Sequence, residues 1–288
     1  MTHMSGMKCI RHLFIFTVLV ICALLAAGCT SSTLAGSPSS TIQSVAPTPA
    51  ASFQETILVF AGAGLKAPLD EIGPAFKQKY GIDVQYNYGG AGTLVSQMNL
   101  THKGDVFIPG STAEWKTAKS QGLVDTYQIV AYHVPAIAVQ KGNPKQITTV
   151  KDLARPGLKV ALGDVSATAI GKASAKIFQK FNITADVEKN VVTRTPTINE
   201  LVTLMNAGQA DAAIMTLDSI NTEKLDLIAI PLSDNQILMT PVGTTTYTQN
   251  GEAATKFAVY VVSDEGKAFF AKHGFPTFPN MTYANVQP

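Results

Sequence analysis

Cysteine is scarce in this chain of 288 residues, which contains three. Cys9 and Cys22 lie in the first 28 residues, so the rest of the chain has a single cysteine, Cys29. One cysteine cannot form a disulfide within that part, and the body that follows it has no thiol for catalysis or metal binding. We therefore expect neither a disulfide-stabilised fold nor thiol chemistry.

Charge is also sparse. Charged residues make up 15% of the chain, with 22 Lys and Arg against 20 Asp and Glu. Lys8 and Arg11 belong to the first 28 residues, so the remainder has 20 basic and 20 acidic residues and is formally neutral. Nucleic-acid-binding domains carry a clustered basic surface. The composition therefore argues against a nucleic-acid partner.

Sequence motifs of catalysis are missing as well. We find no GxSxG, HExxH or P-loop pattern, and the aspartates and lysines form no catalytic motif. His102, His133 and His273 lack the spacing of a metal site, and we expect surface or packing roles for them. These absences predict that the protein is not an enzyme and carries no cofactor.

The N-terminus has the features of an export signal. Lys8 and Arg11 precede the apolar run LFIFTVLVICALLAA (residues 13–27), which ends at Gly28 and Cys29. This pattern predicts a signal peptide over residues 1–28, because the run is shorter than the ~20 residues of a membrane-spanning helix. An uncleaved anchor helix is the alternative. The segment LLAAGC resembles the lipobox of secreted lipoproteins, which implies a lipid on Cys29 and an exported protein in the periplasm or at the outer face of the cytoplasmic membrane.

Residues 29–54 are rich in Ser, Thr, Pro and Ala and contain no charged residue. Such a composition predicts a disordered tether between the lipid and the folded body. Glycosylation sequons begin at Asn99, Asn182 and Asn280. A chain with this much threonine contains such triplets by chance, so they do not indicate a function.

From residue 55 onward, short apolar runs alternate with amphipathic helical patterns. In the first helical pattern Leu65, Leu69, Ile72 and Phe76 lie three or four residues apart. This alternation predicts an α/β fold with mostly parallel sheets flanked by helices. The pattern restarts near residues 131–140, which we interpret as one strand, so two sheets are expected.

Three strand-to-helix loops consist mainly of small residues: AGAGL (61–65), GGAGTL (89–94) and GDVSATAIGK (163–172). Ligands of open parallel sheets bind beyond the carboxyl ends of the strands. A helix start offers unpaired N–H groups and a partial positive charge, and small side chains leave those groups accessible to an anion. The three loops together predict an anion site. The alternative is that the small residues only let helices pack closely on the sheet.

Two long segments, FAGAGLKAPLDEIGPAFKQKYGIDVQYNYGGAGTLVSQM and GDVFIPGSTAEWKTAKSQGLV, resemble the molybdate-binding proteins of ABC uptake systems. The segment DEGKAFFAKHGF resembles the closing helix of the wider class of periplasmic-type binding proteins. The resemblance implies a two-lobed "Venus flytrap" fold, with residues 55–131 and 236–288 in lobe I and residues 132–235 in lobe II.

The resemblance also implies ligand-binding positions. The two serines that the family uses fall at Gly64 and Ala91, and its tyrosine falls at Thr216, so these hydroxyls are missing or changed. Backbone donors from the other lobe fall near Ile170 and Ile198. The hydroxyls of Thr93, Thr168 and Thr216 are expected to replace part of the lost hydrogen bonding. The candidate ligand-binding residues are Ala63, Gly64, Gly90, Ala91, Gly92, Thr93, Thr168, Ala169, Ile170, Ile198 and Thr216.

Charged residues beside the loops need a separate interpretation. Arg194 and Lys172 are expected to be solvated rim charges, although either one would help to neutralise a dianion. Asp105 and Asp164 are expected to accept hydrogen bonds from loop backbone. If they pointed into the site instead, the cargo would be a cation.

The resemblance implies that the protein is a monomeric solute-binding lipoprotein. It would capture a small oxyanion, molybdate or tungstate, and pass it to an ABC permease in the membrane. Two alternatives stay open: a binder of another anion, metal complex or small organic solute on the same fold, or a ligand sensor for a membrane partner.

Overall fold

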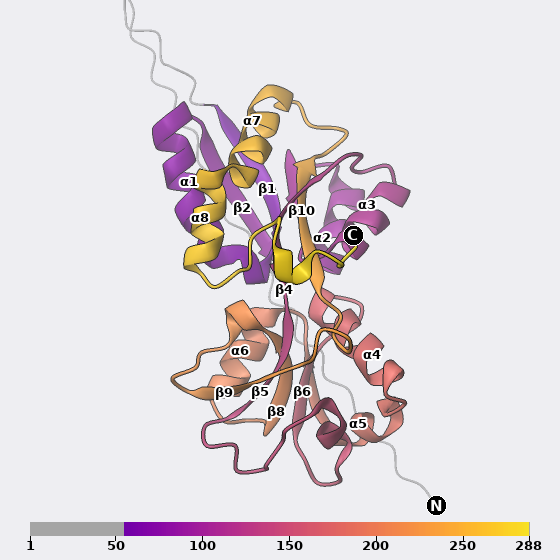
Figure 1. Cartoon of the computed structure of the whole chain (residues 1–288). Coiled ribbons are helices and arrows are strands. Elements are labelled where there is room, and N and C mark those ends of the chain that lie inside the picture. Colours follow the sequence, from indigo (N-terminus) through magenta and orange to yellow (C-terminus); the bar gives the residue numbers. More distant parts are fainter. Residues whose placement is uncertain (1–54, 288) are drawn as a thin grey trace, which may run out of the picture. The chain divides into compact units, whose positions relative to one another are not determined.

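The computed structural model describes residues 55–287. The predicted signal peptide, the lipid site at Cys29 and the predicted tether of residues 29–54 lie outside the described residues. Within residues 55–287, no helix has both the length and the apolar character needed to cross a membrane. The described part has two five-stranded sheets, each flanked by helices (Figure 1).

The first sheet has the strand order β2-β1-β3-β10-β4. β1 runs parallel to β2 and β3, whereas β10 runs antiparallel to β3 and β4. Its strands are β1 (Thr56–Gly62), β2 (Asp83–Gly89), β3 (Val106–Ile108), β4 (Gln128–His133) and β10 (Leu238–Thr244). Its helices are α1 (Lys66–Tyr80), α2 (Ala91–Thr101), α3 (Thr112–Ser120), α7 (Gly251–Val262) and α8 (Asp264–Lys272).

Alternate residues of the central strands face opposite helical layers. In β3, Val106 and Ile108 join a core cluster with residues of α1 and α7, while Phe107 packs with Leu94 of α2 and Trp115 of α3. Figure 1 shows the same layering, with α1, α7 and α8 on one side and α2 and α3 on the other. Burial on both faces explains why this strand is apolar throughout.

The second sheet has the strand order β7-β6-β8-β5-β9. β6 runs parallel to β7 and β8, and β5 runs antiparallel to β8 and β9. Its strands are β5 (Pro135–Gln140), β6 (Val160–Gly163), β7 (Val191–Thr195), β8 (Ala212–Thr216) and β9 (Leu225–Ala229). Its helices are α4 (Ala169–Lys180), α5 (Thr184–Asn190) and α6 (Ile198–Asn206). The predicted two-sheet α/β class is confirmed, with sheets that mix parallel and antiparallel pairs.

The interpretation of residues 131–140 as one strand is wrong. β4 ends at His133 in the first sheet and β5 begins at Pro135 in the second, with Val134 between them. β10 pairs with β4 in the opposite direction, so the chain passes between the sheets twice, at Val134 and after β9. The lobe boundaries at 131/132 and 235/236 stay predictions; in the structure β4 stays in the first sheet as far as His133.

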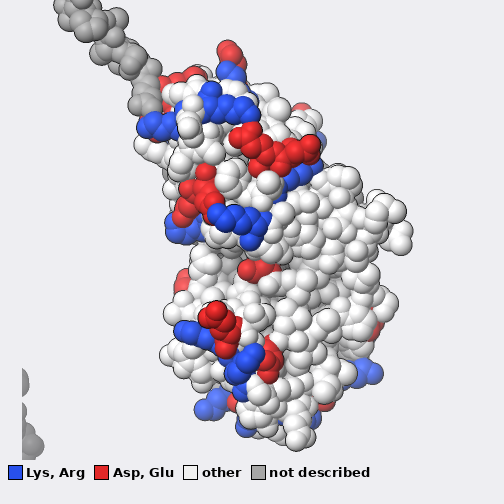
Figure 2. All heavy atoms as spheres, turned by 60° about the vertical axis from the view of Figure 1, so that its left-hand side comes forward, with Lys and Arg blue, Asp and Glu red and all other residues white. Residues whose placement is uncertain are grey.

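Short 3-10 helices complete the described elements. They are η1 (Ala63–Leu65), η2 (Val150–Ala154), η3 (Leu217–Ser219) and η4 (Met281–Tyr283). η1 follows β1 and η3 follows β8, and both strands approach the cavity described next. Figure 2 shows that basic side chains on one face of the protein lie next to acidic ones, without a continuous basic area on that face.

Candidate ligand-binding site

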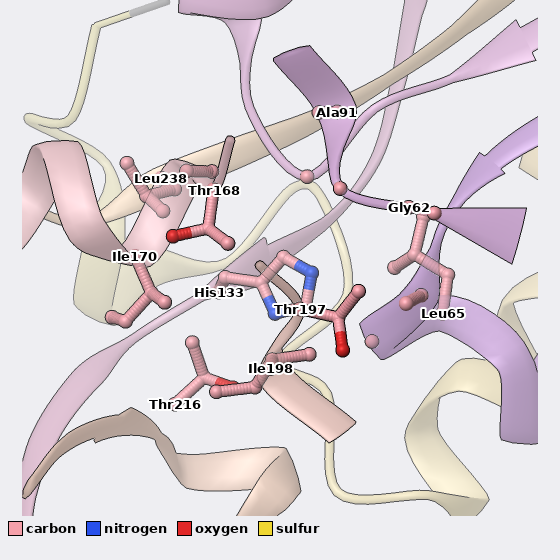
Figure 3. A pocket seen from close by; sticks show the side chains of 16 residues that line it. Gly62, Leu65, Ala91, His133, Thr168, Ile170, Thr197, Ile198, Thr216 and Leu238 are labelled. Atoms are coloured by element: carbon pink, nitrogen blue, oxygen red, sulfur yellow. The ribbon is translucent and has the colours of Figure 1, made fainter. Parts of the chain in front are cut away.

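A small cavity with a volume of about 50 Å³ lies where loops of the two lobes meet (Figure 3). The first lobe lines it with Gly62, Ala63, Gly64, Leu65, Gly89, Gly90, Ala91, Gly110, His133 and Leu238. The second lobe lines it with Thr168, Ala169, Ile170, Thr197, Ile198 and Thr216. Most of these residues lie at or just after the carboxyl ends of strands, which is where α/β sheets bind ligands, whereas Leu238 begins the antiparallel strand β10.

Three helices begin at the cavity wall: α2 at Ala91, α4 at Ala169 and α6 at Ile198. The first amides of a helix have no acceptor within the helix and lie at the positive end of its dipole. α2 has no side-chain cap, whereas Thr168 and Thr197 cap α4 and α6 by accepting from the third amide of each helix. The first amides of α4 and α6 therefore keep their donor capacity toward the cavity.

Glycine in the second loop allows the two lobes to touch. The Gly92 amide donates to the carbonyl of Ala167 at 3.1 Å. A Cβ at Gly92 would lie 2.2 Å from the carbonyl oxygen of Ser166, and one at Gly90 would lie 2.5 Å from that of Pro196. Any larger residue would therefore force the lobes apart.

The structure brings most of the predicted ligand-binding residues together at this cavity. Those that line it are Ala63, Gly64, Gly90, Ala91, Thr168, Ala169, Ile170, Ile198 and Thr216. Gly92 contacts the other lobe instead, and Thr93 is exposed outside the lining. That the lining residues bind a ligand stays a prediction.

The threonine hydroxyls at the cavity already donate to protein acceptors. Thr168 Oγ1 donates to the carbonyl of Asp164 at 2.8 Å, and Thr197 Oγ1 lies 2.9 Å from Glu200 Oε1. Thr216 Oγ1 lies 3.0 Å from Asp218 Oδ2. A hydroxyl has one hydrogen to donate. If these threonines were to take the place of the serine and tyrosine hydroxyls of the family, they would have to give up these hydrogen bonds. The backbone amides are therefore the more available donors to a ligand.

His133 lines the cavity but was not among the predicted ligand-binding residues; the same holds for Gly62, Leu65, Gly89, Gly110, Thr197 and Leu238. The Nδ1 of His133 lies 3.1 Å from Asp218 Oδ1, and the two side chains are only 7% and 2% exposed. The ring of Phe275 packs edge-on against the imidazole, with centroids 5.0 Å apart. His133 ends β4 and Asp218 lies in η3, 85 residues later, so no local pattern joins them.

The charged residues weighed from the sequence lie outside the lining. Asp105 accepts from the amide of Leu58 at 2.8 Å, and Asp164 accepts from the amides of Ser166 and Ala167 at 2.8 and 2.9 Å. Asp164 thus fixes its loop, as predicted, whereas the Leu58 amide that Asp105 binds lies within strand β1. The Ser166 hydroxyl, followed by the Ala167 amide, lowers the pKa of Asp164.

The two basic residues are also engaged elsewhere. Arg194 pairs with Glu188, and Lys172 Nζ lies 2.8 Å from Glu114 Oε1. Among the described residues that line the cavity, none is Asp, Glu, Lys or Arg. No group of three or more His, Cys, Asp or Glu in the described part of the chain could hold a metal ion.

Comparison with known proteins adds independent evidence. The family model described as "Bacterial extracellular solute-binding protein" matches residues 57–276. A "putative binding protein" of Haemophilus influenzae is 26% identical over 221 residues, which are 76% of this chain and 90% of the relative.

A relative from Mycobacterium tuberculosis, the "Molybdate-binding protein ModA", is 27% identical over 263 residues. That alignment covers 89% of this chain and 95% of the relative. The solved structure of the sulfate-binding protein SubI from the same organism shares the fold, with a TM-score of 0.71 at 20% identity over 81% of this chain and 92% of that one.

Proposed function

The chain belongs to the family of bacterial extracellular solute-binding proteins, and we propose that it captures molybdate or tungstate and delivers it to an ABC importer. The family binds solutes for transport and does not catalyse reactions. Importers of this class work with a membrane permease, which is the partner that we propose for this protein.

The size and chemistry of the cavity carry the proposal. A cavity needs about 10–15 Å³ to hold a water molecule, so a volume of about 50 Å³ has room for roughly three to five. That room suits a tetrahedral ion with four oxygens, whereas the pockets that bind organic ligands of drug size have volumes of about 300–1,000 Å³. The lining has small and apolar side chains and no carboxylate, so an anion meets helix-start amides without repulsion from an adjacent acid.

The helix-start amides lie on both lobes, and this explains how a ligand would favour the closed arrangement. An oxyanion that accepts from α2 on one lobe and from α4 and α6 on the other makes all its contacts only when the lobes meet. A ligand shifts a conformational equilibrium by its difference in affinity for the two states. Closure is therefore the expected response to binding.

Isothermal titration of the purified full-length protein tests the proposal. We expect binding of molybdate and tungstate and much weaker binding of sulfate and phosphate. Tighter binding of sulfate or phosphate would show that the ligand is an oxyanion other than molybdate or tungstate. A lack of response to all four anions would overturn the proposal.

We also propose that Cys29 is lipidated and holds the exported protein at the membrane. Mass spectrometry of the membrane fraction should find a lipid on Cys29, and Cys29→Ala should release the protein from that fraction. An unmodified Cys29 in a protein that stays membrane-bound would instead support an uncleaved anchor helix.

A further inference from the structure

The inference concerns His133, which is the one histidine among the described residues that line the cavity. An imidazole can carry a hydrogen on either ring nitrogen or on both. Figure 3 shows its ring projecting among the labelled side chains of the cavity. With a side chain only 7% exposed, the ring is almost fully desolvated.

Asp218 determines which ring nitrogen faces the protein. An ionised carboxylate only accepts hydrogen bonds, so the contact of 3.1 Å requires a hydrogen on Nδ1. The other nitrogen, Nε2, has no hydrogen-bond partner among the described residues. It accepts a hydrogen bond when the ring is neutral and donates one when the ring is protonated.

The surrounding charges favour the protonated ring when an anion is bound. Asp218 is 2% exposed, and it receives one further hydrogen bond, from the hydroxyl of Thr216. If His133 were neutral, the negative charge of Asp218 would be separated from the bound anion only by the imidazole ring. The carboxylate would then repel the anion. A protonated His133 cancels that charge and offers an N–H to the anion.

Other titratable groups near Asp218 are already paired. They lie in a neighbouring cavity, to which α1 and the segment after α8 contribute Lys66, Asp70 and His273. Lys66 Nζ lies 2.6 Å from Asp70 Oδ2, and His273 Nε2 lies 2.7 Å from Glu71 Oε1. These pairs leave His133 as the group facing the cavity that can neutralise Asp218.

We propose that His133 contacts the bound oxyanion through Nε2–H, that Asp218 positions the ring, and that capture of a dianion is therefore accompanied by uptake of one proton from solvent. This inference rests on the proposed function and specifies its ligand as a doubly charged oxyanion. The proton adds to Nε2, and the ring then carries the charge that balances Asp218.

The test is isothermal titration of the full-length protein with molybdate and tungstate at about pH 8, where an ordinary histidine is neutral. Titrations in buffers with different ionisation enthalpies report the number of protons taken up per anion. We expect close to one proton for the wild type. His133→Gln should abolish the uptake and weaken binding about 10- to 100-fold, the worth of one hydrogen bond to a charged group.

Two further variants complete the test. Asp218→Asn should reduce the uptake while measurable binding remains, which separates positioning of the ring from loss of the site. His273→Gln, a histidine outside the cavity lining, should change neither quantity. If His133→Gln does not fold, the inference is still tested by the number of protons that the wild type takes up per anion and by the reduced uptake expected for Asp218→Asn.

Anion binding without proton uptake, or uptake that persists in His133→Gln, would overturn this inference and leave the proposed function intact. A wild-type protein that binds neither anion would overturn the proposed function and this inference with it.

Discussion

The amide of Gly92 in lobe I donates to the carbonyl of Ala167 in lobe II, with 3.1 Å between nitrogen and oxygen. Asn199 repeats this link in the opposite sense, because its Nδ2 donates to the carbonyl of Ala63 at 3.0 Å. One backbone–backbone hydrogen bond and one side-chain–backbone hydrogen bond thus join the two lobes directly beside the cavity. Glycine at position 92 makes the first of these links sterically allowed, because a Cβ there would lie 2.2 Å from the carbonyl oxygen of Ser166.

The first prediction is that Gly92→Ala weakens anion binding at least about 100-fold. Its Cβ would lie 2.2 Å from the carbonyl oxygen of Ser166, which belongs to the other lobe, so the closed arrangement would be strained. Gly251→Ala is the matched control, because a Cβ there meets nothing within 4 Å. Titration calorimetry measures the anion affinity of both variants. An equal affinity of Gly92→Ala and Gly251→Ala would show that anion binding does not need the lobe contact at Gly92.

The second prediction is that Ala91→Ser tightens molybdate binding about 10- to 100-fold. Ala91 lines the cavity at the position where the family resemblance places a serine, and a hydroxyl there would add one hydrogen bond to a charged ligand. The measurement is the dissociation constant of molybdate for Ala91→Ser, compared with that for the wild type. An unchanged or weaker affinity would mean that the cavity has been rebuilt for another ligand.

The third prediction is that Gly64→Ser, at the other serine position, weakens binding. A Cβ at Gly64 would lie 2.9 Å from Cγ2 of Ile198, and a β-branched side chain has little freedom to move away. The double variant with Ile198→Ala should recover part of the affinity by removing that contact. Tighter binding by Gly64→Ser alone would contradict the steric explanation.

These predictions show which parts of the site the sequence could supply. The loops 61–65 and 89–94 could be recognised because strand, small residues and helix follow one another locally. The pairing of His133 with Asp218 could not, because it joins residues 85 positions apart. The use of Gly92 for lobe contact also depends on the facing backbone of Ser166, which no local pattern reveals.

The fold divides in the same way. A helix with regular apolar spacing, α1, was predicted from local sequence. β10 and β7 were not identified, since LMTPVGT contains a proline and VVTRT is short and half-polar. The break at Val134 was missed because the run of residues 131–140 is apolar on both sides of it, and only the pairing with two different sheets reveals it.

The fourth prediction concerns Glu114 and Lys172, which join α3 of lobe I to α4 of lobe II. Their side chains are 2% and 34% exposed, with 2.8 Å between Nζ and Oε1. Lys172→Met should weaken anion binding by about 1 kcal/mol, because a partly exposed ion pair that bridges the lobes stabilises the closed arrangement. Lys176→Met, on the same helix, is the control, and an identical affinity in all three proteins would contradict the prediction.

The fifth prediction concerns pH and the loop at Asp164. Hydrogen bonds from the Ser166 hydroxyl and the Ala167 amide lower the pKa of Asp164 from its ordinary value of 3.8. The unfolded chain therefore binds this proton at a higher pH than the folded one, so the stabilisation is complete above about pH 5 and is lost as the pH falls through the lowered pKa.

Asp164→Asn should accordingly reduce the free energy of unfolding by roughly 1 kcal/mol at neutral pH. The difference from the wild type should shrink as the pH falls below 3.8. Urea unfolding at several pH values measures this, with Asp186→Asn as a surface control. A difference that stays constant with pH would show that the ionised carboxylate is not responsible.

A crystal structure of the full-length protein with tungstate tests the central claim most directly, because tungsten is located by its anomalous scattering. We predict one tungsten atom in the cavity, with its oxygens within hydrogen-bond distance of amides at the starts of α2, α4 and α6. Tungsten bound elsewhere, or held in the cavity by side chains without these amides, would contradict the claim.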